Sequence, residues 1–288
     1  MPTVSQKSFR LVMGTALGSV CLIVFTGALV RLTGSGLGCS DWPRCNETKF
    51  VDVSTGHTMI EQVNRLFTGV VSASVIAAVL LSYFRKPRRA DLVKLSWGLI
   101  IGVLAQVVIG GIVVLTGLNP FANMAHFLVS IILITNAFVL YRRSMSDAPS
   151  IYIRRLAPGR SSTLLPLAVL GALAIVTGTV VTATGPHAGD EDAVRFGFAL
   201  TSVARLHGVA VMLTVTFIVF LAVKARKWSD KRFSEAVQTL LIVACFQGAI
   251  GYTQYFTGVP VILVAAHIIG AVSFWLAICN VLFEESHS

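Results

Sequence analysis

Three histidines lie inside long apolar stretches of the sequence, where an imidazole is costly and usually functional. They are His126, His207 and His267. If these stretches are helices that enter a membrane from its outer side, all three histidines lie about 10 Å below the outer boundary, at a rise of about 1.5 Å per residue. Imidazoles at one depth on different helices of a bundle can hold a haem iron. Alternatively, each histidine could bond a neighbouring helix.

His207 and His267 form the stronger pair because they belong to the same half of the chain. That half has no carboxylate or cysteine at the same depth, so a zinc site is the weaker interpretation. We therefore predict that His207 and His267 bind one haem iron from opposite faces.

The first half of the chain carries a different set of side chains at this depth. His126 corresponds to His267, but Asn64 stands where a second histidine is needed. An asparagine amide is a poor ligand for iron, so a haem here would be held on one side only. The asymmetry predicts a firmly bound cofactor in the second half and a looser site, for a haem that reacts and leaves, in the first.

Glu61 is the acidic residue that we place within a membrane span. It lies one turn from His57 and one turn from Asn64, on the same helical face. A carboxylate beside a reacting group can accept a proton or orient a water molecule. The alternative is a first-turn carboxylate that the helix dipole favours.

Four arginines lie near the expected outer ends of helices, away from the other basic residues. Guanidinium groups suit carboxylates, so they are candidates to bind the propionates of a haem. Snorkelling to lipid headgroups is the alternative for each of them. The four are Arg31, Arg65, Arg195 and Arg205.

Cys39 and Cys45 lie in the first outer loop, on the oxidising side of the membrane. Their spacing permits a small disulfide-closed loop. This disulfide could be a structural staple over the mouth of the bundle, or a redox-active pair.

Composition indicates how these residues are positioned. Of 288 residues, 55% are hydrophobic and 12% are charged, about half the charged share of a soluble domain. The sequence therefore predicts an all-α integral membrane protein rather than a soluble or disordered chain. The eight expected spans are 11–32, 58–84, 93–116, 121–142, 163–184, 200–223, 236–257 and 260–283.

Most of the 23 Lys and Arg residues fall before the first span or between spans 2 and 3, 4 and 5, and 6 and 7. Eight spans place all these segments on one side, which the positive-inside rule makes cytoplasmic. The net charge of +10 therefore reflects topology and contact with anionic lipid rather than nucleic-acid binding. Both termini are expected in the cytoplasm.

The chain repeats part of itself. The pattern Gln106…Gly110…Ala125-His126 returns as Gln247…Gly251…Ala266-His267, and Thr26-Gly27 returns as Thr177-Gly178. Small residues that pack helices could explain the glycines, but they explain the Gln and His matches less well. We predict two parallel four-helix bundles, 1–145 and 161–288, joined by a basic cytoplasmic linker, 146–160. Their pseudo-twofold axis should lie along the membrane normal.

The sequence resembles the haem A synthase family of membrane oxidoreductases. The most specific match is TGALVRLTGSGLGCSDWPRC, from Thr26 to Cys45, and the glutamate, the histidines and the duplicated plan also match. The family oxidises a ring methyl of haem O to a formyl group by successive hydroxylations, with haem b as cofactor. The resemblance implies these roles: His207 and His267 as haem b ligands, Glu61 as catalytic carboxylate, His126 as substrate-haem ligand, and Cys39–Cys45 as a disulfide.

Asn64 departs from the family, which commonly has histidine there, and His57 could compensate only if the mouth of the helix shifts. The resemblance implies haem O and membrane lipid as partners, with a haem O synthase and an electron-transfer protein, in a bacterial plasma membrane. Oligomerisation of the chain stays open.

Two other functions remain open from the sequence. A quinol-linked electron carrier of the cytochrome b kind would also use paired histidines, but it does not need Glu61 or an asymmetric first site. A transporter with two parallel halves would need polar residues along a through-path, and the inner halves of the spans have few.

Overall fold

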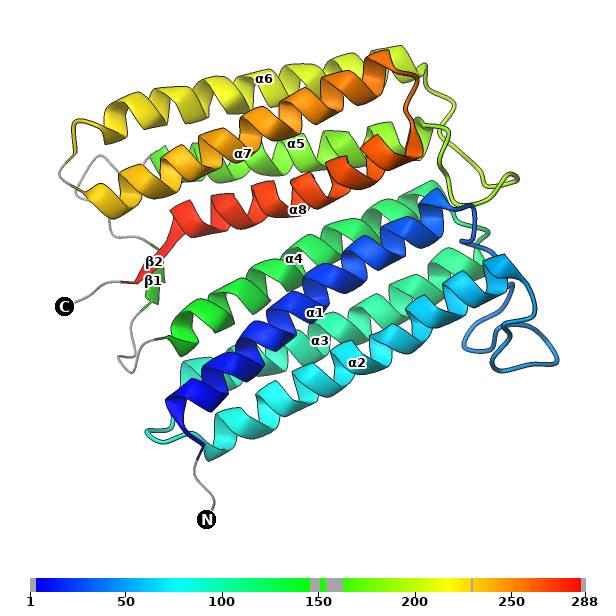
Figure 1. Cartoon of the computed structure of the whole chain (residues 1–288), viewed down its shortest axis with the longest axis horizontal. Helices are drawn as coiled ribbons and strands as arrows, with labels where there is room; N and C mark the ends of the chain where they lie inside the picture. Colours follow the sequence, from blue (N-terminus) through cyan, green and yellow to red (C-terminus); the bar gives the residue numbers. More distant parts are fainter. Residues whose placement is uncertain (1–3, 146–150, 154–162, 229, 286–288) are drawn as a thin grey trace. The chain divides into compact units, whose positions relative to one another are not determined.

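The computed structural model describes residues 4–145, 151–153, 163–228 and 230–285. In this part of the chain, eight helices are long and apolar enough to cross a membrane. This confirms the predicted multi-pass helical membrane protein. The helices are α1 (Gln6–Leu32), α2 (Gly56–Phe84), α3 (Ala90–Leu115), α4 (Pro120–Ser144), α5 (Leu164–Thr184), α6 (Leu200–Ala225), α7 (Lys231–Phe256) and α8 (Val261–Leu282) (Figure 1).

Local sequence signals set several helix starts. The Ser5 and Asp230 side chains accept hydrogen bonds from main-chain N–H groups in the first turns of α1 and α7. Thr55 forms a capping box with Thr58 at the start of α2. Asn119 caps α4, in which Pro120 is the first residue. These caps pair N–H groups that have no partner within the helix.

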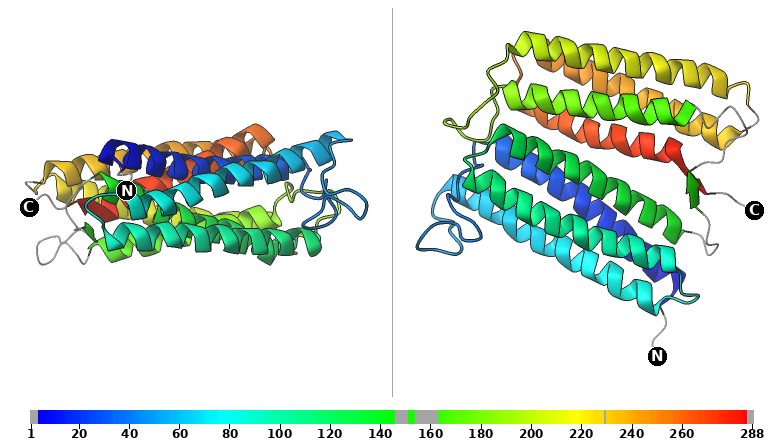
Figure 2. Two further views of the ribbon diagram at one scale, coloured as in Figure 1. Left: turned by 90° about the horizontal axis from the view of Figure 1, so that it is seen from below. Right: turned by 180° about the vertical axis from the view of Figure 1, so that it is seen from behind.

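The chain divides into two compact units. In the first unit, α1 packs against α2 and α4, and α3 packs against α2 and α4. In the second, α5 packs against α6 and α8, and α7 packs against α6 and α8. Each unit is therefore a four-helix bundle in which every helix has two neighbours, and Figure 2 shows the helices of each unit side by side.

Large apolar side chains cover the outside of the helices. Ile132 on α4 and Ile262 on α8 expose 68% and 77% of their surface, and Leu165 and Phe246 are similarly exposed. Apolar surface on this scale is unfavourable in water, whereas hydrocarbon solvates it. The exposed residues are therefore those expected at a lipid-facing surface.

The segment His187–Phe196, between α5 and α6, belongs to the first unit. The Gly36 N–H donates to the Gly189 carbonyl over 2.8 Å, and the Phe196 ring meets the Phe121 ring edge-on. Ala188 packs with Ala193, with Val113 of α3 and with Leu118 of the α3–α4 turn in a small apolar cluster. The division expected from the sequence, at 146–160, did not anticipate this placement.

Two short strands add to the predicted helices. β1 (Ile151–Ile153) pairs antiparallel with β2 (Phe283–Glu285), with Tyr152 opposite Glu284. β1 lies in the predicted linker 146–160, the rest of which is outside the described residues. The all-α prediction did not include this pair.

Candidate functional site

In the second unit, both predicted ligand histidines face a glycine on a neighbouring helix. A β-carbon placed on Gly178 of α5 would lie 3.2 Å from Cε1 of His207, and one on Gly251 of α7 would lie 2.9 Å from Cε1 of His267. The two glycines therefore provide space that the imidazole rings fill. The rings are also close enough to interact electrostatically.

A threonine beside Gly178 sets the orientation of the His207 ring. Thr177 Oγ1 lies 3.1 Å from His207 Nδ1 and donates its own proton to the Leu173 carbonyl over 2.7 Å. Because the hydroxyl proton is already used, Oγ1 is left to accept a proton from Nδ1. This tautomer leaves the lone pair on Nε2, which is the form that binds a metal.

The main-chain carbonyl of His267 is bound by a glutamine side chain. Gln247 on α7 donates from Nε2 to the His267 carbonyl over 2.8 Å. In the described part of the chain, Gln247 Oε1 and His267 Nδ1 are both buried without a hydrogen-bond partner.

The first unit repeats these contacts with one change of side chain. His126 on α4 faces Gly110 on α3, with 3.4 Å from Cε1 to a β-carbon placed there. Gln106 on α3 donates to the His126 carbonyl over 3.0 Å. Asn64 on α2 faces Gly27 on α1, with 3.9 Å from Nδ2 to a β-carbon placed there. Asn64 on α2 thus lies beside a glycine of α1, as His207 on α6 lies beside a glycine of α5.

Glu61 is buried, and both of its carboxylate oxygens are engaged. Oε2 accepts from the Cys39 main-chain N–H over 2.7 Å. Oε1 accepts from Nε and Nη2 of Arg65 over 3.0 and 2.6 Å. Glu61 thus connects one turn of α2 to the first cysteine of the outer loop.

Arg65 also binds this loop, because Nη1 donates to the carbonyls of Asp41 and Arg44 over 3.1 and 3.0 Å. Of the four predicted propionate-binding arginines, Arg65 is therefore already used in holding Glu61 and the loop.

The other three arginines have different surroundings. Arg31 at the end of α1 donates from Nε to the His187 carbonyl over 2.7 Å. Arg195, in the segment that joins the first unit, is close enough to Arg31 for their charges to repel. Arg205 is exposed on α6 of the second unit.

His57 lies in the first turn of α2 and is exposed. Its Nδ1 is 2.9 Å from Oγ of the buried Ser35. The loop thus holds His57 at the mouth of the helix, two turns from Asn64.

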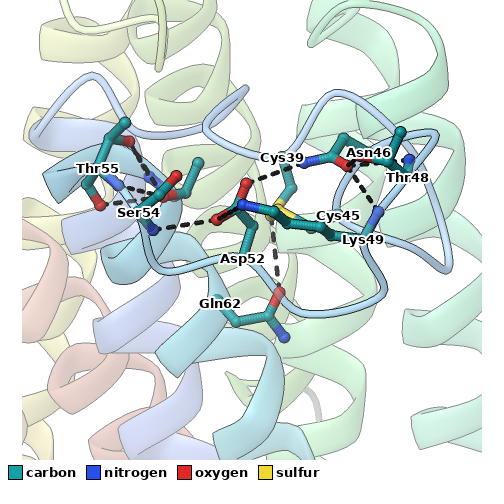
Figure 3. Close-up of polar contacts among 10 residues, drawn as sticks. Cys39, Cys45, Asn46, Thr48, Lys49, Asp52, Ser54, Thr55 and Gln62 are labelled. Atoms are coloured by element: carbon teal, nitrogen blue, oxygen red, sulfur yellow. Dashed lines mark hydrogen bonds and ion pairs between the residues drawn. A yellow bond between two sulfur atoms is a disulfide. The ribbon is translucent and has the colours of Figure 1, made fainter.

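The predicted Cys39–Cys45 disulfide is present in the structure and fully buried. Figure 3 shows it above Gln62, whose Oε1 lies 3.7 Å from Cys39 Sγ. Trp42, between the two cysteines, packs on Gly111 of α3. The disulfide is therefore enclosed by helices α2 and α3 and by its own loop.

Asp52 organises the second part of this loop (Figure 3). It accepts from the Ser54 N–H over 3.0 Å, from Asn46 Nδ2 over 3.0 Å and from Lys49 Nζ over 3.2 Å. The hydrogen bonds from Ser54, together with nearby Lys49, lower the pKa of Asp52 to about 2.

The low pKa of Asp52 predicts how the loop responds to acid. A carboxyl group whose pKa is lowered by folding stabilises the fold fully above its ordinary pKa of about 4. This contribution is lost as the pH falls toward the folded value of about 2. We expect the rate at which a phosphine reduces Cys39–Cys45, relative to the rate in Asp52→Asn at the same pH, to rise as the pH falls through this window.

The rate of disulfide reduction in Asp52→Asn is the reference, because asparagine has the size of aspartate but cannot ionise. A wild-type rate that follows the variant at every pH would contradict the prediction.

The sequence matches the profile of the COX15-CtaA family, described as cytochrome oxidase assembly protein, over residues 10–54 and 48–189. The chain belongs to this family. Family membership supports a role for haem, and the sequence resemblance to haem A synthases agrees with it.

Several relatives of this family member are named Heme A synthase. A protein named Heme A synthase from Listeria welshimeri is 26% identical over 289 residues, which cover 93% of each chain. Heme A synthases from Geobacillus kaustophilus and Lysinibacillus sphaericus are 35% and 36% identical over 106 and 112 residues. These two matches cover 36% and 38% of this chain, and 33% and 36% of the relatives.

The side chains present fit a haem in the second unit of this COX15-CtaA protein. His207 is in the tautomer that binds a metal, and both rings pack against glycines rather than against larger side chains. Among the residues that the structure describes, no three His, Cys, Asp or Glu side chains gather at one point. Haem iron needs only one or two ligands from the protein.

The sequence did not reveal which residues contact the candidate ligand histidines in the two sites. Thr177, Gln106 and Gln247 were used only as markers of the duplication, although each contacts a candidate ligand histidine. The two glutamines recur in the sequence at the same distance from His126 and His267. Helix packing alone does not require a glutamine, so this recurrence could have indicated a contact with the histidines.

Proposed function

We propose that this chain is a haem A synthase, which oxidises the ring methyl of haem O to the formyl group of haem A. The observation that carries the proposal is the pair of unequal sites. Two histidines face glycines in the second unit, whereas one histidine and one asparagine face the equivalent glycines in the first. Full-length similarity to proteins named Heme A synthase supports this assignment.

His207 and His267 would hold haem b as the resident cofactor. Haem supplies one-electron and oxygen chemistry when bound. The protein contributes a fixed imidazole tautomer through Thr177 and a close approach of the rings to α5 and α7 through Gly178 and Gly251. These features orient both ligands before binding, which lowers the cost of ordering them.

His126 would bind the iron of haem O as substrate. On the other side Asn64 presents an amide, which does not bind iron firmly. Single-sided ligation suits a haem that must arrive and leave. Its lipid-soluble tail is compatible with a bundle whose outer surface is apolar, and dry walls protect a reactive site from side reactions.

Glu61 would act beside the substrate, as a proton acceptor or by orienting water for the hydroxylations. Each carboxylate oxygen has more than one lone pair, so the bonds from Cys39 and Arg65 leave acceptor capacity. Those bonds hold the carboxylate in one position, and Arg65 forms an ion pair with it.

Arg31 and Arg195 would bind the propionates of the substrate haem. Two guanidinium groups that repel each other are stabilised by an anion between them. Arg205, on the second unit, would bind a propionate of haem b.

The basic segments between helices support an orientation with both termini in the cytoplasm of a bacterium. The equivalent contacts of His126 with Gly110 and of His267 with Gly251 support the duplication into two parallel bundles. A haem O synthase and an electron-transfer protein would be the partners.

The assignment is tested by incubating the purified protein with haem O and following the haem by mass. A formyl-bearing product is expected. Unchanged haem O, with normal reduction and oxidation of a bound haem, would instead favour the electron carrier of the cytochrome b kind. A protein that binds no haem would favour the transporter.

Asn64 offers a gain-of-ligand test of the substrate site. Gly27 leaves space for a ring at this position, and Thr26 precedes it as Thr177 precedes Gly178. We expect Asn64→His to convert bound haem O from five-coordinate to six-coordinate low-spin, measured by absorption and resonance Raman spectra. Asn64→Gln is the control, since a longer amide adds no imidazole. An unchanged haem O spectrum in Asn64→His would contradict the assignment of this position.

A further inference from the structure

Two glutamines one turn before the ligand-facing glycines share one hydrogen bond and one unpaired atom. Gln106 and Gln247 each donate from Nε2 to the main-chain carbonyl of the histidine across from them, His126 and His267, over 3.0 and 2.8 Å. Gln106 Nε2 also donates to Ser130 Oγ over 2.8 Å. In both cases Oε1 of the glutamine is buried and has no partner within the described residues.

The histidines that these glutamines hold are incomplete as well. Nδ1 of His126 and Nδ1 of His267 are buried without a partner in the part of the chain that the structure describes. In each unit, the glutamine therefore has an unpaired acceptor, Oε1, and the histidine has a ring nitrogen, Nδ1, that can donate. The same two residues are already joined by a hydrogen bond. A buried polar atom without a partner costs about 1–3 kcal/mol, and here both copies of the site retain the same two.

We propose that Gln106 and Gln247 are positioning residues for the iron ligands. When His126 or His267 binds iron through Nε2, its Nδ1–H donates to Oε1 of the paired glutamine. This inference rests on the proposed function, because it needs iron at Nε2. It assigns to the two glutamines the task that Thr177 performs for His207, where the partner of Nδ1 is already in place at 3.1 Å.

Gly270, on α8 one turn beyond His267, has no side chain at the place where Gln247 Oε1 lies against the helix. The His267 ring faces Gly251 instead, so the amide of Gln247 must turn toward the ring to accept from Nδ1–H. The main-chain carbonyl of Gln247 also faces the His267 ring, so the experiment must separate the side chain from the backbone.

An acceptor on Nδ1–H makes an imidazole a more basic ligand, which stabilises ferric over ferrous haem. Gln247→Leu removes donor and acceptor, whereas Gln247→Glu loses the amide donor and keeps an oxygen acceptor. We expect Gln247→Leu to raise the midpoint potential of haem b and to speed transfer of haem b to apomyoglobin by roughly 10-fold or more. Gln247→Glu should keep the wild-type spectrum and transfer rate.

Two controls separate this inference from general damage. Gln238→Leu changes an exposed glutamine on the same helix and should alter nothing. Gln106→Leu should leave haem b unchanged and should weaken binding of haem O.

The outcomes distinguish a failure of the proposed function from a failure of the role proposed for Gln247. A wild-type protein without a two-histidine haem spectrum would defeat the proposed function itself. A normal wild-type spectrum together with an unchanged potential in Gln247→Leu would defeat only the role of the glutamine. Equal shifts in Gln247→Leu and Gln247→Glu would also defeat it, because the amide donor alone would then be responsible. Loss of all haem in Gln247→Leu with a normal Gln247→Glu protein would support it.

Discussion

Replacing His207 by alanine should yield a folded membrane protein that has lost the low-spin spectrum of haem b. The atoms nearest to a β-carbon placed on Gly178 belong to the His207 imidazole, and its Nδ1 is held by Thr177. Alanine would leave a space at this point and no ligand on one side of the haem. Because α6 also packs against α5 and α7, the bundle itself should survive the substitution.

His267→Ala should have the same effect, since haem b needs both ligands for its low-spin state. The matched control is His126→Ala, which makes the same change in the first unit and should leave haem b in place. The measurement is the reduced-minus-oxidised spectrum per mole of protein, with thermal unfolding in detergent as a check on folding. Full retention of low-spin haem in His207→Ala would contradict the site, and equal loss in all three variants would indicate a structural role for the histidines.

Thr177→Val should give an intermediate result. Valine has a similar shape but cannot accept the proton of His207 Nδ1, so the ring keeps its space and loses its fixed tautomer. Loss of a hydrogen-bond partner of a metal-binding imidazole costs about 10–100-fold in metal affinity. We therefore expect haem b to bind but to exchange faster with an external acceptor than it does from the wild-type protein.

Hydropathy was sufficient to find all eight membrane helices because each is a long run of apolar residues. It located their ends less well. α7 begins at Lys231, five residues before the expected 236, because Asp230 caps a polar first turn that hydropathy does not detect. Capping chemistry, rather than transfer to lipid, sets that boundary.

The histidines were identified from the sequence because their cost within lipid makes them conspicuous. Main-chain groups that act as hydrogen-bond partners were not identified from the sequence. The carboxylate of Glu61 binds the N–H of Cys39, and the carbonyl of Gly189 accepts from Gly36. Every residue carries a main-chain carbonyl, and every residue except proline carries a main-chain N–H. No residue type therefore marks these groups, and only the folded loops bring them together.

Glu61→Gln should abolish production of haem A while leaving haem b and the outer loop intact. The amide can still accept the hydrogen bond from the Cys39 N–H, but it cannot take up a proton or pair with the charge of Arg65. A side chain that transfers a proton in the transition state contributes about 10²–10⁴-fold to the rate, and we expect a loss of that order. Product haem is measured by mass and haem b by its spectrum.

Glu61→Ala separates chemistry from anchoring. Alanine also removes the acceptor for Cys39 N–H, so the loop loses its tie to α2, and a phosphine should reduce Cys39–Cys45 faster than in Glu61→Gln. If Glu61 only anchors the loop, Glu61→Gln should remain active, because it keeps that anchor, and only Glu61→Ala should fail. Loss of activity in Glu61→Gln with a wild-type rate of disulfide reduction would instead place the function in the carboxylate, held by Arg65 and Cys39 beside the substrate.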